Sequence, residues 1–364
     1  MGTSSGCRPR CRSESFLSLL LGIPAFFIIL AVLILVHELG HFAMAKLMGV
    51  RVDEFGLGFP PRLKTWRRNG TIYSLNAIPL GGFVKMLGEN GEDTEPDSFG
   101  SKPQWQRLVI LAAGPAMNLT LAVVVLFMVF VSGSPKSIAV ITGVTAHSPA
   151  QKAGLRTGDH ILALDGSRVQ YLEDLQVSTQ AHQGQRVTLE VERGSRIFTV
   201  HLTPRVNPPP TQGRIGVQME KTTTVRYDPG TALNLSVSQL GQMVATLPVL
   251  AQNIAQHNGG QVAGPIGIAQ ATTQVVHQEP QNGLGSLFFF MALLSANLGI
   301  LNLLPIPALD GGRIIFVLIS WMRRRNLDPE LEGVIHVVGM AVLLLLILVV
   351  SYQDIVRWVS GGSF

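Results

Sequence analysis

Length, composition and charge together are those of a membrane protein. The chain has 364 residues, of which 47% are hydrophobic and only 14% are charged, whereas soluble domains carry about 25% charged residues. The formal net charge of +5 is modest and no basic cluster is interleaved with aromatic residues, so the composition argues against a nucleic-acid partner.

The N-terminal segment, residues 1–15, is expected to be a polar tail, and it contains both cysteines of the chain, Cys7 and Cys11. Two cysteines in a tail cannot build a disulfide framework, so a metal site elsewhere has to use nitrogen and oxygen ligands. The apolar run that follows is too long for a signal peptide and lacks a small-residue cleavage signal. We therefore expect it to be retained as a membrane span.

Four segments are long and apolar enough to cross a bilayer, which takes about 20 residues. They are residues 16–36, 108–131, 284–304 and 333–350. The first is expected to continue as helix to residue 48, and the third to resume, after a break rich in Pro and Gly at 305–312, up to residue 322. Non-helical backbone at membrane depth is tolerated only where protein buries it or where it lines a watery cavity. The break is therefore itself a candidate site.

Basic residues predict the orientation of the spans, because they favour the cytoplasmic side. They gather between the first two spans and just after the third: Arg51, Arg62, Lys64, Arg67, Arg68, Lys85, Lys102, Arg107, Arg323, Arg324 and Arg325. The arginines at positions 8, 10 and 12 favour the opposite orientation. We expect both basic loops in the cytoplasm, with both termini and the segment between spans two and three on the outer face.

The loop between the first two spans, residues 51–106, is predicted to contain a short β-hairpin. Residues 71–75 and 82–87 are typical of strands, and Pro79 with Gly81-Gly82 is expected to form the turn between them. A sheet this close to a membrane-embedded site would offer its edge to an entering peptide. The alternative is a hairpin that only braces the helix.

The region 138–205 has the composition of a soluble α+β domain, with expected strands at 138–144 and 161–164, a helix at 172–182 and a hairpin at 186–200. The run S-P-A-Q-K-A-G-L-R-T-G-D-H-I-L-A-L-D-G of residues 148–166 resembles a PDZ domain. Such domains bind an extended peptide at a sheet edge. The histidines of this region have no metal-like spacing and are interpreted as surface or core residues: His147, His160, His182 and His201.

Residues 206–283 are expected to form a linker and a membrane-associated amphipathic helix. Three consecutive prolines at 208–210 make the linker stiff. An apolar stripe then runs from Leu233 to Ile254 along an uncharged helix, suited to packing against other spans or to lying on the bilayer. The segment 264–268 is expected to break the chain before the third span.

Candidate metal ligands lie where the first span ends, in the H-E-x-x-H motif of His37, Glu38 and His41. On a helix, two histidines four positions apart project from one face, and both imidazoles can then bind one Zn²⁺ with the glutamate beside the attacking water. Ionisable residues at membrane depth are costly and usually functional. The alternative is the polar end of an ordinary anchor helix.

A catalytic zinc usually takes three protein ligands, and the natural source of the third is Asp310. It is a lone carboxylate in the broken third span, where an unpaired charge would be strongly disfavoured. A zinc ion shared with the two histidines would supply its partner.

Five motifs in this order resemble the site-2 protease family of intramembrane zinc metalloproteases, most closely the branch of bacterial regulator-of-sigma-E proteases. They are H-E-L-G-H at 37–41, G-G-F-V-K-M at 81–86, G-P-A-M-N at 114–118, the PDZ-like run, and N-x-x-P-x-P-x-L-D-G-G at 302–312. The resemblance covers the chain from residue 16 onwards. It implies a polytopic α-helical membrane protein of four transmembrane helices, the third broken, whose protease core is formed by residues 16–137 and 284–364.

The resemblance also implies roles for individual residues. One Zn²⁺ per chain is expected on His37, His41 and Asp310, with Glu38 as the catalytic base. Substrate-binding residues are expected in the unwound segment and on the edge strand: Asn302, Pro305, Pro307, Gly82, Phe83, Val84, Lys85 and Met86. The best-known members carry two tandem PDZ domains, whereas this sequence has room for one, which puts any gating role of the pair in doubt here.

The expected function is hydrolysis of peptide bonds in transmembrane segments of membrane-anchored regulatory proteins, such as anti-sigma factors, and of remnant signal peptides. The expected location is the bacterial plasma membrane, with the active site toward the cytoplasm. Two other classes stay open. In a non-enzymatic scaffold whose PDZ domain recruits peptides, the zinc would be structural or absent; structural sites favour four protein ligands, and only three are visible in the sequence. An ion or proton carrier would explain the buried charges but not the paired histidines.

Overall fold

The computed structural model describes residues 9–89, 95–209, 212–219, 222–246, 264–282, 284–324 and 328–359. The chain divides into two compact units, the first formed by Met1–Val129 with Asp228–Phe364 and the second by Phe130–Tyr227. Cys7, Arg325 and the part of the predicted amphipathic helix beyond residue 246 lie outside the described residues.

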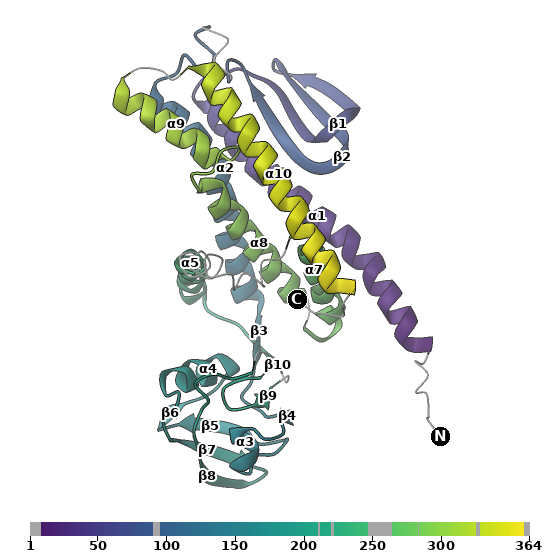
Figure 1. The fold of residues 1–364 in the computed structure, drawn as a ribbon, viewed down its shortest axis with the longest axis vertical. Helices are drawn as coiled ribbons and strands as arrows, with labels where there is room; N and C mark the ends of the chain where they lie inside the picture. The colour runs from purple at the N-terminus through teal and green to yellow at the C-terminus, as the bar shows by residue number, and fades with distance from the viewer. Residues whose placement is uncertain are drawn as a thin grey trace. The chain divides into compact units, whose positions relative to one another are not determined.

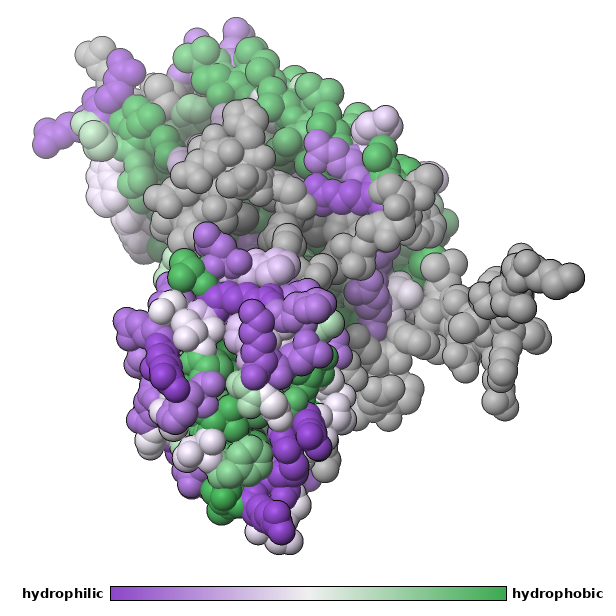
Figure 2. All heavy atoms as spheres, turned by 60° about the horizontal axis from the view of Figure 1, so that its bottom comes forward, coloured by the Kyte–Doolittle hydropathy of each residue, from purple (hydrophilic) through white to green (hydrophobic). Residues whose placement is uncertain are grey.

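Four helices of the described chain are long and apolar enough to cross a membrane, at Gly22–Leu47, Gln104–Ser132, Gly285–Leu303 and Glu330–Arg357. They correspond to the four predicted spans and belong to α1 (Pro9–Leu47), α2 (Gln104–Ser132), α8 (Gly285–Leu303) and α10 (Pro329–Val359) (Figure 1). Apolar side chains of α10 are exposed, as Val337 is at 70%. The space-filling view shows the helices of the first unit as a largely hydrophobic surface and the second unit as a largely hydrophilic one (Figure 2). The chain is therefore a membrane protein.

The third span is broken where the Pro- and Gly-rich segment predicts it. Helix α8 ends at Leu303 and α9 (Asp310–Arg323) begins seven residues later. Pro305 and Pro307 have no N–H to donate and cannot continue the helix. Asp310 is therefore the first residue of a new helix.

The β-structure after α1 is larger than predicted and turns at a different place. It consists of β1 (Val52–Arg68) and β2 (Thr71–Met86). The hairpin turns at Asn69-Gly70, where both residues have positive φ, and not at Pro79 and Gly81-Gly82. An Asn-Gly pair suits a two-residue hairpin turn because both positions tolerate positive φ. The partner strand β1 was not predicted.

Both strands fold back, so that the N-terminal part of β1 pairs with two parts of β2. Residues 52–57 pair with 82–86, residues 54–57 also pair with 72–75, and residues 62–68 pair with 71–76. Residues 82–86 thus pair with β1 through one edge only, among the pairings of the described strands. This is the segment predicted to bind substrate.

A buried apolar cluster holds α1, the β-structure, α2 and α9 together. Its members are Ala45, Val50, Val52, Val84, Met86, Phe99, Ile110, Leu111 and Val317. Burying such side chains contributes roughly 1.5–3 kcal/mol each for the larger ones. Because the cluster joins elements far apart in sequence, it fixes the ends of α1 and α9 beside each other.

Two further helices of the first unit are α5 (Pro229–Ala245) and α7 (Pro265–Asn282). The structure corrects the expectation of a simple chain break at 264–268, because α7 begins there. Its N-terminus is capped by a carboxylate from α10: the amides of Gly264 and Gly267 donate to Asp354 Oδ2 at 3.0 and 2.8 Å. Pro265 suits a first helical position, where no N–H is needed.

The second unit is a small α+β fold with its own apolar core. Its central sheet has the order β6-β5-β7-β8, formed by β5 (His160–Leu164), β6 (Ser167–Arg168), β7 (Val187–Arg193) and β8 (Arg196–Leu202). Its helices are α3 (Pro149–Lys152) and α4 (Leu172–Ala181). Two short pairs, β4 (Gly143–Val144) with β9 (Val217–Gln218) and β3 (Ser134–Ser137) with β10 (Thr222–Val225), extend the unit beyond the predicted 138–205.

One partly buried ion pair, between Arg193 and the buried Asp159, stabilises this unit. Burial by itself would raise the pKa of the Asp159 carboxyl, but the guanidinium of Arg193 and the amide of Arg156 hold that pKa below its usual value. Arg193 donates from Nε and Nη2 to the two carboxylate oxygens at 2.6 and 2.7 Å. Such a bidentate pair is among the stronger side-chain contacts in proteins.

Candidate metal centre

The three predicted metal ligands converge on one point. Nε2 of His37 and Nε2 of His41 lie 3.3 Å apart on successive turns of α1, and Oδ2 of Asp310 lies 3.1 and 3.4 Å from them. Both histidines are buried. Among the described residues, His37, His41 and Asp310 are the group of side chains whose ligand atoms lie close enough together to share a metal ion.

The spacing of these atoms fits a zinc ion. Ligand atoms at about 2.0–2.1 Å from zinc in tetrahedral geometry are separated by roughly 3.3 Å. The three measured separations of 3.1, 3.3 and 3.4 Å agree with that value. Asp310 Oδ2 is also buried without a hydrogen-bond partner, which is costly for a carboxylate unless a cation neutralises it. The donor set of two imidazoles and one carboxylate suits a catalytic zinc site.

Helix α2 orients the ring of His41. The Nδ1 atom of His41 donates to the carbonyl oxygen of Ile110 at 2.9 Å, which leaves Nε2 free to face the ion. Zinc-bound histidines usually have such a partner on their second nitrogen. Gly114, one turn further along α2, has no room for a side chain because a Cβ there would overlap the His41 ring.

The ring of His37 meets the same face of α2 at Asn118. The side-chain nitrogen of Asn118 lies 3.2 Å from His37 Nδ1, and Asn118 is fully buried. Its side-chain oxygen has no hydrogen-bond partner. Ile110, Gly114 and Asn118 are spaced by four residues, so one stripe of α2 supports both histidines.

The predicted base, Glu38, faces the edge strand. A side chain at Gly82 would come within 3.0 Å of Glu38 Cγ and within 2.9 Å of Ile34. The backbone of β2 therefore passes directly beside Glu38. This brings the predicted substrate-binding strand to the base.

An ion pair connects the end of the edge strand to α9. Arg313, one turn after Asp310, donates to Glu89 Oε1, and Glu89 Oε2 accepts from the amide of Met86 at 3.4 Å. The ion pair therefore joins the last residue of β2 to the helix that begins with Asp310.

The remaining predicted substrate-binding residues lie shortly before Asp310 in the sequence. Asn302 lies in the last turn of α8, and Pro305 and Pro307 lie in the segment between α8 and α9. The partners Ile110, Asn118 and Arg313 were not predicted; the only sequence signal was that Asn118 falls within the G-P-A-M-N motif.

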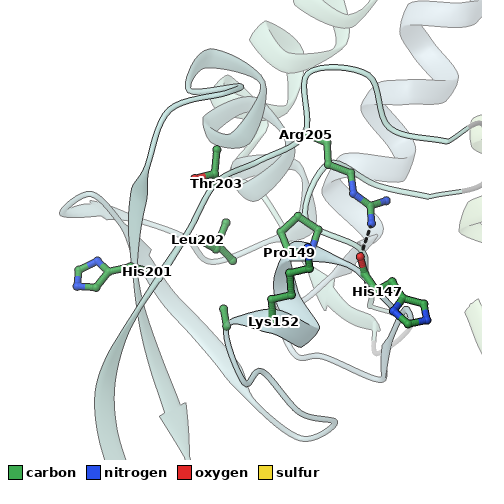
Figure 3. Close-up of a pocket in the computed structure, with 8 residues that line it drawn as sticks. His147, Pro149, Lys152, His201, Leu202, Thr203 and Arg205 are labelled. Carbon is green, nitrogen blue, oxygen red and sulfur yellow. Dashed lines mark hydrogen bonds between the residues drawn. The ribbon is translucent and has the colours of Figure 1, made fainter.

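The second unit has a separate, open pocket of about 410 Å³. It is lined by His147, Pro149, Lys152, Ala153, His201, Leu202, Thr203 and Arg205. Figure 3 shows His201 on the opposite side from His147, whose carbonyl oxygen accepts a hydrogen bond from Arg205 at 3.0 Å. The two histidines are thus not arranged to share a metal ion.

Comparisons with known proteins identify the family of the chain. The profile of peptidase family M50 matches residues 25–346. A Clostridium acetobutylicum protein provisionally named a zinc metalloprotease is 34% identical over 349 residues, covering 94% of this chain and 98% of the relative. The regulator of sigma-W protease RasP of Bacillus subtilis is 29% identical over 430 residues, covering 92% and 98%. Among solved structures, the PDZ domain of the SdrC-like protein of Listeria monocytogenes covers 23% of this chain and 87% of its own, with 17% identity and a TM-score of only 0.20.

The site and these matches define a zinc metalloendopeptidase of the membrane. The chain belongs to peptidase family M50, the site-2 proteases. The predictions of the family, of an enzyme and of zinc as its cofactor are confirmed.

Proposed function

We propose that the chain cleaves transmembrane segments of membrane-anchored regulatory proteins, such as anti-sigma factors, with remnant signal peptides as a second substrate class. The observation that carries the proposal is that His37, His41 and Asp310, whose side chains could bind one zinc ion, converge near a strand edge that has no partner among the described strands. The relative from Bacillus subtilis, whose name describes a regulator of sigma-W protease, supports the substrate class.

In the proposed mechanism His37, His41 and Asp310 hold the metal. A zinc ion there supplies Lewis acidity, which polarises a carbonyl group and makes water more acidic. Glu38 accepts the proton of the attacking water and returns it to the leaving amine. The Ile110 carbonyl and the Asn118 side chain keep the imidazoles turned toward the ion.

Substrate access requires an extended backbone, because a transmembrane helix hides its peptide bonds in its own hydrogen bonds. Residues 82–86 replace those bonds by strand addition, since one edge of this segment has no partner strand in the described sheet. Gly82 brings the added backbone beside Glu38. Asn302, whose side-chain amide both donates and accepts, would stabilise a freed peptide group, and Pro305 and Pro307 keep the segment next to it non-helical.

The second unit is proposed to be a PDZ domain on the outer face of the bacterial plasma membrane, where it binds peptide and excludes substrates with bulky outer domains. Its ends meet at the point of insertion: the amide of Tyr227 donates to the Phe130 carbonyl at 3.1 Å, and β3 pairs with β10. The unit can therefore be removed with little strain on the flanking chain.

The decisive experiment compares wild type with Glu38→Gln in detergent or liposomes, on a substrate that carries one transmembrane helix. The variant should bind one zinc per chain but cleave at least a hundredfold more slowly, because a general base contributes about 10²–10⁴ in rate. Cleavage by the variant at the wild-type rate would refute the role of Glu38.

A second experiment tests the exclusion of bulky substrates. Residues 134–225 are replaced by a short Gly-Ser linker, and cleavage is measured on a substrate with and without a folded outer domain. The shortened protein should cleave both forms, whereas wild type should cleave only the trimmed one. Equal discrimination by both proteins would disprove exclusion by the second unit.

A further inference from the structure

The segment between α8 and α9, residues 304–309, has few N–H groups that can form backbone hydrogen bonds. Pro305 and Pro307 carry no N–H. The amide of Ile306 donates to Leu304 at 2.7 Å and that of Leu309 donates to Ile306 at 3.2 Å, both within the segment. The amide of Leu304, the first residue of the segment, donates back to the Leu301 carbonyl of α8 at 3.0 Å, whereas the N–H of Ala308 donates to a side chain of another helix.

Ala308 has an unusual backbone conformation. Its φ is +79°, a region that residues with a Cβ adopt only at a cost in energy. The residue lies two positions before Asp310. A strained backbone at this place persists only if neighbouring groups hold it.

The group that holds it comes from the fourth span. The amide of Ala308 donates to Nδ1 of His336 on α10 at 3.1 Å. The His336 ring also meets the ring of Phe316 on α9 edge to face, with centroids 5.5 Å apart. His336 therefore lies between the segment and the helix that begins with Asp310.

The close approach of α10 at this point has a second cause. Gly339 is three residues after His336 and so lies on the same face of α10. A Cβ at Gly339 would overlap Pro307. The glycine lets the helix come close enough for His336 to reach the Ala308 amide.

We propose that His336 is a positioning residue for the third zinc ligand: by accepting the Ala308 N–H it holds the segment in the strained conformation that brings Asp310 to His37 and His41. This inference rests on the proposed role of Asp310 as a ligand. Loss of this acceptor leaves the Ala308 N–H without its partner and removes the contact that offsets the strain at positive φ, so without His336 the segment relaxes and Asp310 leaves the site for part of the time. Apparent zinc affinity falls with the fraction of chains in the competent conformation.

The test uses two substitutions of His336 that differ in one property. Asn places its Oδ1 near the position of Nδ1 and keeps an acceptor, whereas Phe keeps an aromatic ring against Phe316 but accepts no hydrogen bond. Zinc affinity is measured on purified full-length protein by competition with a chromophoric chelator, and cleavage is measured beside it. Val337→Ala is the control, because Val337 is an exposed neighbour on α10.

We expect His336→Phe to weaken zinc binding roughly tenfold, in line with the loss of one partly buried hydrogen bond, and His336→Asn to stay within about threefold of wild type. Ala308→Gly should restore zinc binding to the His336→Phe protein, because glycine adopts positive φ without strain, while changing wild type little. A role for His336 in anchoring α10 alone would not be repaired by Ala308→Gly.

Three results would overturn the proposal: wild-type zinc affinity in His336→Phe, equal losses in the Asn and Phe variants, or the same effect of Ala308→Gly in both backgrounds. If instead Asp310 is not a zinc ligand, Asp310→Ala would bind zinc as tightly as wild type. This measurement therefore separates a failure of the proposed function from a failure of the role proposed for His336.

Discussion

The substitution Asn118→Leu should weaken zinc binding by 10- to 100-fold, the range found when the outer partner of a zinc-bound histidine is removed. The reason lies in the proton on His37. To bind zinc through Nε2, the neutral ring has to carry its proton on Nδ1, 3.2 Å from the Asn118 amide. The Oδ1 atom of the amide can accept a hydrogen bond from this Nδ1–H group once the amide oxygen and nitrogen exchange places. The unpartnered Oδ1 of Asn118 is then satisfied.

The magnitude follows from the contacts around the two rings. His41 keeps its backbone acceptor, the Ile110 carbonyl at 2.9 Å, so only one of two imidazoles loses its partner. A loss of 10- to 100-fold corresponds to about 1.4–2.7 kcal/mol, the size expected for one hydrogen bond to a group that becomes partly charged.

The assay is equilibrium competition for zinc between the purified protein and a chelator. Asn118→Asp should retain more affinity than Asn118→Leu, because a carboxylate still accepts from His37 Nδ1. Ser295→Ala is the matched control: it removes the 2.7 Å contact of the Ser295 hydroxyl to the Asn118 carbonyl and leaves the amide in place. Zinc affinity of Asn118→Leu within twofold of wild type would refute this reasoning.

Three further predictions concern other parts of the structure. Gly82→Val should bind zinc normally and lose cleavage, because its side chain fills the space beside Glu38; Gly333→Val, which meets nothing within 4 Å, is the control, and full activity of Gly82→Val would contradict the edge-strand role. Arg313→Gln should lower cleavage more than zinc affinity, because it frees the end of the edge strand at Glu89; a substrate KM unchanged from wild type would count against this. Because the folded-state pKa of Asp159 is depressed, its contribution to stability is complete above the unfolded pKa of about 3.9 and is lost as pH falls toward the folded value. Protection factors of β5 and β7 amides in the intact protein, from hydrogen exchange corrected for the pH dependence of the intrinsic rate, should therefore fall below pH 4 in wild type, whereas Asp159→Asn should be less protected already at pH 6 with a flatter dependence; equal protection at pH 6 would disprove the role of the ion pair.

The sequence predicts those parts of the site that depend on local spacing. His37 and His41 are four residues apart on one helix, and this spacing alone brings their rings together. Asp310 could be added because a lone carboxylate in a broken span needs a cation. The four spans follow from length and hydropathy, which act over consecutive residues.

The parts that could not be predicted depend on contacts between distant elements. Asn118 supports His37 only because α2 packs against α1 in one particular register, which no local pattern reveals. Helix α7 begins among glycine and proline residues, Gly264, Pro265 and Gly267, which locally indicate a break, and its cap is Asp354, about ninety residues away along the chain. The Asn69-Gly70 pair is itself typical of a hairpin turn. However, β1 contains Pro60-Pro61 and a basic segment, and both features are more typical of a loop than of a strand.

The most direct test of the account is X-ray absorption at the zinc edge of the purified protein, with zinc counted per chain. We predict one zinc bound by two imidazole nitrogens and at least one oxygen, each at about 2.0–2.1 Å, and loss of that zinc from the triple variant His37→Ala, His41→Ala, Asp310→Ala. Sulfur in the first coordination sphere, or a full zinc complement in the triple variant, would contradict the assignment of these three residues.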